Sequence, residues 1–361
     1  MHPQGQSYQK RLLTPELTPT MDPSPHQMAW LARSDGSVLI GHGPFQQSDH
    51  QPTSGAAFYV QDFSLKKPSE WIIPDHYETI TREEFSQRFQ QKRSLDIEWQ
   101  TIDAVPFSEV FQDIMTSIHD GVFEKTVPVV TETGVSSEPI SQTAVAAMAQ
   151  ASPPLHSYGF INETEGFAGA TPELLLSMKG NQLETMALAG TARSEDQDVF
   201  AVDEKEIREH EYVAQTLVSK LLDLGTLDRQ ERQILDLGTL VHFLTRIQVN
   251  MDTPLSPETL IKRLHPTPAL GPLPRTDSTM QQLLSWRKKL ACPDQFGSPF
   301  GVWENGRFDA VVAIRGIWWH DEKIQIPTGC GIIEASRLVN EWRELRLKRE
   351  AVKQYLRLRS N

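Results

Sequence analysis

The stretch from Ser157 to Thr191 limits the possible folds of this 361-residue chain more than any other part of the sequence. Short runs of alternating apolar residues are separated there by Glu-Gly and Lys-Gly pairs, so the pattern predicts consecutive antiparallel strands. Glu173 lies in the middle of this stretch, which ends with the small residues ALAGT. Because a charged carboxyl group is costly to bury and small residues let a ligand approach the backbone, the stretch gives a first indication of a functional site.

The composition is that of a globular protein, with 39% hydrophobic and 23% charged residues, and the length allows one large domain or two. No run approaches about 18 consecutive apolar residues, so we expect no membrane span. The N-terminus has no apolar signal core, which predicts that the chain is not exported. The two cysteines, Cys292 and Cys330, give no disulfide framework and fit a reducing cytoplasm.

The net charge of −12 bears on the partners of the chain. Without a long basic run, this charge argues against nucleic acid as the main partner. It also repels small anions, so an anionic substrate would need local cations from arginine, lysine or a metal ion.

The order of predicted elements indicates an α+β protein. Residues 1–27 are rich in Pro, Gln, Ser and Thr and predict a flexible leader. Strand and helix patterns then alternate over 28–361 without a linker-like stretch, so one large α+β domain is the simplest interpretation. Two β-branched runs, KTVPVV from Lys125 and RFDAVVAIRGIWW from Arg307, are each predicted as a strand.

Two predicted helices carry glutamates at helical spacing. Glu341, Glu344 and Lys348 follow one another by about one turn, and Glu206 and Glu209 do the same on an earlier helix. Such stripes are most often solvated faces with Glu-to-Lys pairs. The alternative is that both helices clamp one hard divalent ion such as Mg²⁺, and the spacing leaves both interpretations open.

Four further residues each allow a structural and a functional interpretation. Lys125 is either an edge lysine in water or a base whose pKa is lowered by desolvation. Glu173 is either an exposed strand-end carboxylate or a general acid kept protonated by apolar surroundings. Arg315 is either a surface cation or a bidentate carboxylate binder. His265 fits a loop residue as well as a catalyst.

Eight motifs, in a compatible order and spacing, resemble those of the chorismate-utilising enzymes. This family includes isochorismate synthases, salicylate synthases, and the large subunits of anthranilate and aminodeoxychorismate synthases. The resemblance runs from about residue 107 to about 350. The motifs are FAGATPELLL, ALAGTARS, KEIREHEYV, LHPTPALGPLPR, FGSPFGVW, VVAIRG, TGCGII and NEWRELRLK.

The resemblance implies the chorismate-binding α+β fold of the anthranilate synthase component I type. In that fold, large antiparallel β-sheets pack as a sandwich with helices outside. The implied domain spans 28–361 and follows the leader at 1–27.

The resemblance also implies a Mg²⁺-dependent site. It makes Lys125 the base that activates water, Glu173 the acid that protonates the leaving hydroxyl, and His265 a neighbour of the ring. The implied metal ligands are Glu209, Glu341 and Glu344, with Glu206 nearby. The implied substrate-binding residues are Arg315, Lys348, Gly190, Thr191, Gly329 and Gly331 for the carboxylates, and Ala269, Leu270 and Phe296 for the apolar wall.

Ala189 decides the implied branch of the family. Members that link a nucleophile covalently to the ring carry lysine at this place, whereas hydroxylating members carry alanine. The resemblance therefore implies a cytoplasmic, monomeric isochorismate synthase that adds water at C2 of chorismate and removes the C4 hydroxyl, for menaquinone or siderophore biosynthesis. The alternatives are a salicylate synthase, which also eliminates pyruvate, and a degenerate homologue that binds chorismate without turnover.

Three segments depart from the family pattern. The family's strand after the base usually reads Lys-Val-Val-Leu-Ala-Arg, whereas KTVPVV has Pro128 inside it and Val130 in place of the arginine. Because a proline cannot donate a hydrogen bond to the neighbouring strand, this strand is expected to be bent or to lie at an edge of the sheet. The run from Thr328 to Gly331 and the pair Ser298-Pro299 are bulkier than usual and crowd the carboxylate end of the implied site.

Overall fold

A computed structural model describes residues 26–68, 70–90 and 95–360. The predicted leader at 1–27 therefore lies almost entirely outside the described residues, and the single domain over 28–361 stays a prediction. Among the described residues, no helix combines the length and the apolar character needed to cross a bilayer.

Over the described ranges, eighteen strands are linked by hydrogen bonds into one continuous sheet, and two more form a separate pair. The strands are β1 (Gln27–Ala32), β2 (Ser37–Ser48), β3 (Ala56–Val60), β4 (Trp71–Thr81), β5 (Leu95–Trp99), β6 (Lys125–Thr126), β7 (Val129–Ser136), β8 (His156–Asn162), β9 (Glu165–Thr171), β10 (Leu174–Lys179), β11 (Gln182–Arg193), β12 (Gly225–Arg229), β13 (Gln233–Asp236), β14 (Leu240–Met251), β15 (Pro299–Glu304), β16 (Arg307–Val312), β17 (Gly316–His320), β18 (Lys323–Gly329), β19 (Ile332–Ile333) and β20 (Leu358–Ser360).

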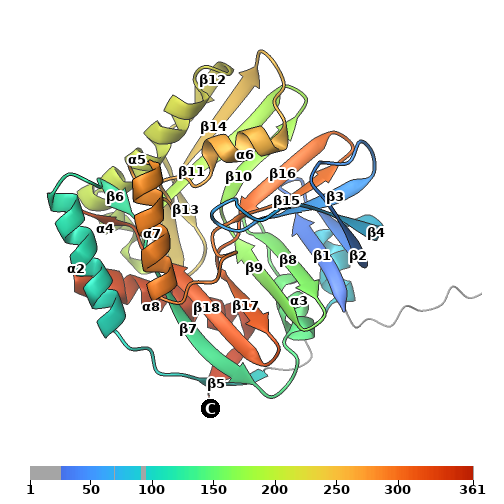
Figure 1. Cartoon of the computed structure of the whole chain (residues 1–361), viewed down its shortest axis with the longest axis horizontal. Coiled ribbons are helices and arrows are strands. Elements are labelled where there is room, and N and C mark those ends of the chain that lie inside the picture. Colours follow the sequence, from blue (N-terminus) through green and yellow to red (C-terminus); the bar gives the residue numbers. More distant parts are fainter. Residues whose placement is uncertain (1–25, 69, 91–94, 361) are drawn as a thin grey trace, which may run out of the picture.

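Hydrogen bonds join the strands of the large sheet, which are drawn in Figure 1, edge to edge into one strip. Its neighbouring strands are β20, β5, β7, β18, β17, β9, β8, β1, β2, β4, β3, β15, β16, β10, β11 and β14, with β12 and β13 both paired to β14. Every pairing in this sheet is antiparallel except that of β20 with β5. The antiparallel order predicted for the strands within 157–191 is therefore confirmed.

The strip folds back so that its two halves face each other. The ring of Phe300 on β15 lies 5.8 Å from that of Tyr158 on β8 and 5.6 Å from that of Phe167 on β9, although these strands are far apart along the strip. The largest apolar cluster contains residues of both halves, among them Tyr158, Phe167 and Phe300. The expected sandwich of antiparallel sheets is therefore present, built from one connected sheet.

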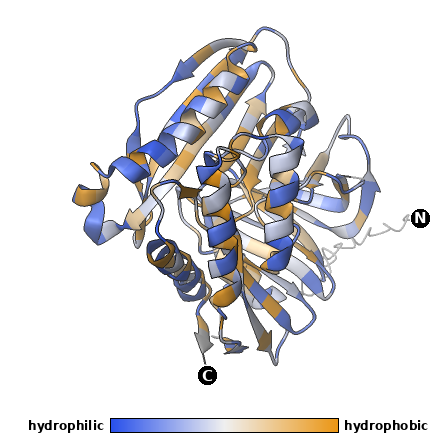
Figure 2. Cartoon of the chain, turned by 60° about the vertical axis from the view of Figure 1, so that its left-hand side comes forward, coloured by the Kyte–Doolittle hydropathy of each residue, from blue (hydrophilic) through white to orange (hydrophobic). Residues whose placement is uncertain are grey.

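The described part of the chain contains eight α-helices. They are α1 (Arg82–Arg88), α2 (Val105–His119), α3 (Ser141–Met148), α4 (Gln197–Phe200), α5 (Glu204–Leu221), α6 (Pro257–Leu264), α7 (Asp277–Lys289) and α8 (Leu338–Leu356). Helix α5 packs on β11 and β14, and α8 packs on β18. Both hydrophilic and hydrophobic residues lie around the helices in Figure 2, as expected for helices with one face on the sheet and one in solvent.

Two strands that the sequence predicts as continuous are interrupted. KTVPVV is divided into β6 and β7 at Val127 and Pro128, in agreement with the bend expected from the proline. The prediction of a single strand over RFDAVVAIRGIWW is wrong, because the chain leaves the ladder between β16 and β17. Arg315 has a φ of 58° there, a left-handed conformation that a strand cannot contain. Both interruptions border the cavity described next.

Candidate active site

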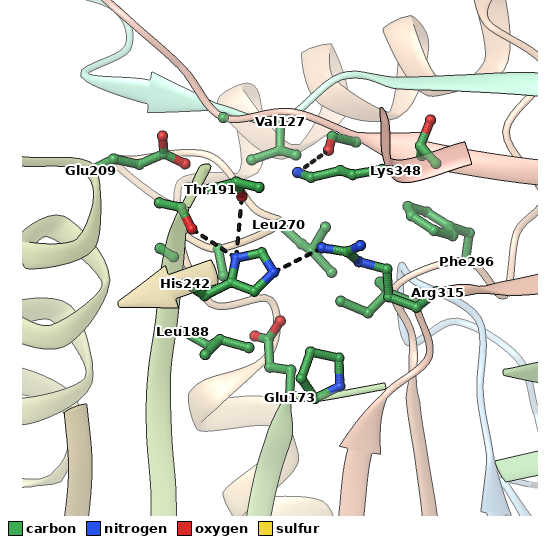
Figure 3. A pocket seen from close by; sticks show the side chains of 18 of the residues that line it. Val127, Glu173, Leu188, Thr191, Glu209, His242, Leu270, Phe296, Arg315 and Lys348 are labelled. Carbon is green, nitrogen blue, oxygen red and sulfur yellow. Dashed lines mark hydrogen bonds between the residues drawn. The ribbon is translucent and has the colours of Figure 1, made fainter. Parts of the chain in front are cut away.

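A cavity of about 70 Å³ lies at one end of the sandwich, between β11, β14, β18, α5 and α8. The cavity brings together residues from segments far apart in sequence (Figure 3). The predicted site residues that line it are Glu173, Gly190, Thr191, Glu209, Ala269, Leu270, Phe296, Arg315, Gly329, Gly331 and Lys348.

Glu173 lies where the chain turns from β9 into β10. Its backbone N–H donates to Thr171 Oγ1 at 3.2 Å, and its carbonyl accepts from the Val312 N–H at 3.0 Å. A shift of register between Leu174 and Leu176 bends the strand beside it. The side chain is buried, and this burial raises the pKa of Glu173 to about 7 although Lys125 and Lys348 oppose the shift. Such a carboxyl group can hold or release a proton near neutral pH.

Arg315 is held by a histidine that the sequence does not single out. Its Nη2 donates to His242 Nε2 at 2.9 Å, which leaves Nδ1 of this histidine to donate to the Gly190 carbonyl at 2.7 Å. Burial and Arg315 lower the pKa of His242 well below its usual range, so the ring is a neutral acceptor. Burial also lowers the pKa of Arg315 to about 10, a value at which the guanidinium remains a cation at neutral pH.

Lys348 provides the second cation of the cavity wall. Its Nζ donates to the Gly329 carbonyl at 2.8 Å and lies 2.6 Å from Glu344 Oε1, one turn earlier on α8. Arg315 and Lys348 together supply the positive charge that an anionic substrate would need in an acidic protein. Two predicted backbone groups already have partners, since the Gly190 carbonyl accepts from His242 Nδ1 at 2.7 Å and the Thr191 N–H donates to Glu206 Oε2 at 2.8 Å.

Lys125 is fully buried and does not border the cavity. Its Nζ lies 3.4 Å from Glu209 Oε1 and donates to the Pro268 carbonyl. Burial lowers the pKa of Lys125, and Glu209 opposes this shift. Gly331 covers the pair, because a Cβ at this position would lie 2.0 Å from Glu209 Oε1 and 3.0 Å from Lys125 Cε.

Three glutamates meet around Lys205, another residue whose role the sequence does not indicate. Lys205 Nζ is 2.8 Å from Glu206 Oε1, 3.3 Å from Glu209 Oε2 and 3.5 Å from Glu341 Oε1. Glu344, a predicted metal ligand, is paired with Lys348 instead. Within the described ranges, no group of three or more His, Cys, Asp or Glu side chains is placed so that it could hold a metal ion.

The protonation of this cluster follows from burial and charge. Burial raises the pKa of Glu206 and of Glu341 to about 7, and the neighbouring carboxylates add to the shift. Burial also opposes ionisation of Glu209, but Lys205, Lys125 and Lys348 together lower its pKa. Burial would lower the pKa of Lys205, yet the surrounding carboxylates raise it. The cluster is therefore a place where positive charge is strongly favoured.

His265 does not border the cavity, contrary to the expectation that it stands beside the ring of a substrate. Its Nε2 is 2.8 Å from the Phe63 carbonyl, and its ring packs edge-on against that of Phe63 at 5.1 Å. Burial lowers the pKa of His265 to about 3, which keeps the imidazole neutral. These contacts support a structural role behind the wall formed by Ala269 and Leu270.

The wall near β11 is made of small residues. Ala189 lines the cavity beside Leu188 and Gly190, and Gly190 has a φ of 75°, which favours glycine. No nucleophilic side chain is present at position 189.

The family model described as "Chorismate binding enzyme" matches residues 25–357. The isochorismate synthase EntC of Escherichia coli K12 is 26% identical over 314 residues, which cover 79% of this chain and 77% of EntC. DhbC of Bacillus anthracis, named as a 2,3-dihydroxybenzoate-specific isochorismate synthase, superposes with a TM-score of 0.78 at 20% identity, over 92% of this chain and 97% of DhbC. MenF of Escherichia coli, the menaquinone-specific isochorismate synthase, gives a TM-score of 0.77 at 17% identity, over 92% and 90% of the two chains.

Proposed function

The chain belongs to the chorismate-binding enzyme family, and from this premise we propose that it is an isochorismate synthase. The observation that carries the proposal is Glu173, a buried carboxyl group with a pKa of about 7 in a cavity whose wall holds Arg315 and Lys348. EntC, DhbC and MenF bear the same activity in their names, which supports the proposal.

The proposed reaction adds water to one ring carbon and removes a hydroxyl from another. Lys125 takes a proton from water as its oxygen bonds to C2, the ring double bonds shift, and the C4–O bond breaks. Glu173 donates a proton to the leaving hydroxyl, which departs as water, so substrate and product are isomers. For Lys125 to act, its amine has to leave the Pro268 carbonyl and reach the cavity past Gly331.

Ala189 supports water as the nucleophile. An alanine at this position provides no amine that could attack the ring, and the small side chain leaves space in the cavity for a water molecule. Arg315 and Lys348 would bind the substrate carboxylates, while Ala269, Leu270 and Phe296 pack against the apolar face of the ring.

We also propose that Mg²⁺ belongs to the site and that Glu209, Glu341 and Glu344 hold it, with Glu206 nearby. The donor set fits, because carboxylate oxygens from α5 and α8 surround one positive charge, and the buried Glu341 Oε2 has no hydrogen-bond partner among the described residues. When bound, Mg²⁺ would neutralise and fix a carboxylate of chorismate.

The pathway that uses the product is a further part of the proposal. Similarity to the menaquinone-specific MenF and to the 2,3-dihydroxybenzoate-specific DhbC supports menaquinone or siderophore biosynthesis. A cytoplasmic monomer remains part of the proposal.

The test is incubation of the purified protein with chorismate and Mg²⁺, followed by chromatographic separation of the products. Isochorismate alone is the expected result. Salicylate with pyruvate would show a salicylate synthase instead. Unchanged chorismate, with binding detected by calorimetry, would show a homologue that binds without turnover.

A further inference from the structure

Lys205 lies where carboxylates of α5 and α8 come together. Its ammonium group is within 3.5 Å of oxygens from Glu206, Glu209 and Glu341. Two of these glutamates belong to α5 and the third to α8, so Lys205 joins two helices that present like charges to each other. Without this ammonium group, the ionised carboxylates of the buried Glu209 and Glu341 and the partly buried Glu206 would repel one another.

The helix dipole at the start of α5 does not explain why the ammonium group of Lys205 lies where it does. The residue lies in the first turn of α5, where the helix dipole favours negative charge, and its neighbours Glu204 and Glu206 follow that rule. Attraction to the glutamates therefore holds the ammonium group in place. About 20% of the side chain remains exposed, so its flexible stem has a path to solvent.

The ammonium group and a metal ion cannot both occupy this place. Mg²⁺ binds oxygen at about 2.0–2.1 Å, whereas Lys205 Nζ keeps the three carboxylates at 2.8–3.5 Å. A divalent ion bound to Glu209 and Glu341 would lie next to Nζ, and the two cations would repel each other strongly. The longer separations also explain why the described carboxylates do not form a metal site in their present positions.

We propose that Lys205 is a displaceable counter-ion: its ammonium group holds the acidic helices together in the metal-free protein, and Mg²⁺ binds by expelling it toward solvent. This inference rests on the proposed function insofar as Mg²⁺ is the metal of the site. It follows that Lys205 stabilises the metal-free protein and weakens its affinity for Mg²⁺.

The experiment compares Mg²⁺ binding by wild type and Lys205→Met, measured by titration calorimetry with MgCl₂ alone at fixed ionic strength. Removing a competing unit charge is expected to tighten the Kd for Mg²⁺ by roughly tenfold or more. Thermal unfolding of the metal-free variant should occur at a lower temperature than that of wild type, and Mg²⁺ should raise it by more. If Lys205→Met does not fold without metal, Lys205→Gln purified in MgCl₂ and then dialysed replaces it.

Two variants serve as controls. Lys205→Arg keeps the charge and should bind Mg²⁺ about as weakly as wild type, and Lys220→Met removes a lysine from the same helix away from the cluster. Unchanged or weaker Mg²⁺ binding by Lys205→Met would overturn the inference, as would a lack of binding by every variant. Wild type that binds Mg²⁺ but leaves chorismate unchanged would contradict the proposed function alone.

Discussion

Burial in this fold gives Glu173 a pKa close to neutral pH. Glu173 is buried at the bend between β9 and β10, and the desolvation of its charged form exceeds the attraction of Lys125 and Lys348. The result is a pKa of about 7, which lets the residue carry a proton that an exposed glutamate would have lost.

Glu173→Gln should abolish turnover while chorismate still binds. The amide has nearly the shape of the acid but cannot donate a proton to the leaving hydroxyl, so we expect kcat to fall by about 10²–10⁴. Turnover is measured by chromatography and binding by calorimetry in the presence of Mg²⁺. A variant that keeps most of its activity would show that Glu173 is not the acid.

The pH dependence of kcat/KM should report the same group. Because burial raises the pKa of Glu173 from 4.5 to about 7, the acid is present below pH 7 and is lost as the pH rises through that value. At saturating Mg²⁺, kcat/KM should therefore decline above pH 7 by close to tenfold per pH unit. A level profile up to about pH 9 would contradict the assignment.

The residues that sequence reasoning missed are those whose meaning depends on distant partners. His242 stands in an apolar strand, and its contact with Arg315 joins positions 73 residues apart. Lys205 is one lysine among charged neighbours on a helix. Glu173, Glu209 and Arg315 belong to motifs and line the cavity, whereas His265, within a motif as well, does not border it.

At the scale of elements, the cavity is bordered by places where strands are interrupted, such as Val127 between β6 and β7 and Arg315 between β16 and β17. The sequence predicts the strands well because alternating apolar residues reveal them, but it does not show that Arg315 leaves the ladder, since its neighbours continue the same pattern. The short pair β6 and β19, in which Ile333 pairs with the buried Lys125, also lies at a break of the main ladder. Glycines allow the close approach of these segments.

Gly331→Ala tests this close approach. The added Cβ would lie 2.0 Å from Glu209 Oε1, so the carboxylate or the backbone before β19 must shift. We expect a loss of about 1–3 kcal/mol in the free energy of unfolding and a large loss of turnover. Denaturant unfolding and product analysis measure the two effects.

Gly329→Ala is the matched comparison. The Cβ added at this position would lie 3.0 Å from its nearest neighbour, Val127 Cγ1. Its effects should be smaller than those of Gly331→Ala. Equal effects on both measurements would show that the contact with Glu209 is not what requires glycine at 331.

At the scale of the molecule, the fold places carboxylates of two separate helices close enough to repel one another. Helices α5 and α8 come from segments more than a hundred residues apart, yet both present carboxylates to one end of the sandwich. The chain as a whole carries a net charge of −12. In the proposed reaction, a dianionic substrate would approach an acidic protein beside an acidic cluster, and of the two cations in the cavity wall, Arg315 and Lys348, the second is itself paired with Glu344.

This balance predicts that chorismate and Mg²⁺ bind cooperatively. The metal removes the repulsion between the glutamates and the substrate, so each ligand should stabilise the protein more in the presence of the other. In thermal unfolding, chorismate with EDTA should shift the midpoint only slightly, whereas chorismate with Mg²⁺ should raise it by ~2–6 °C. Mg²⁺ alone and a matched concentration of NaCl are the controls. If chorismate with EDTA gave the full shift, Arg315 and Lys348 would be sufficient to bind the dianion, and the acidic cluster would have another purpose.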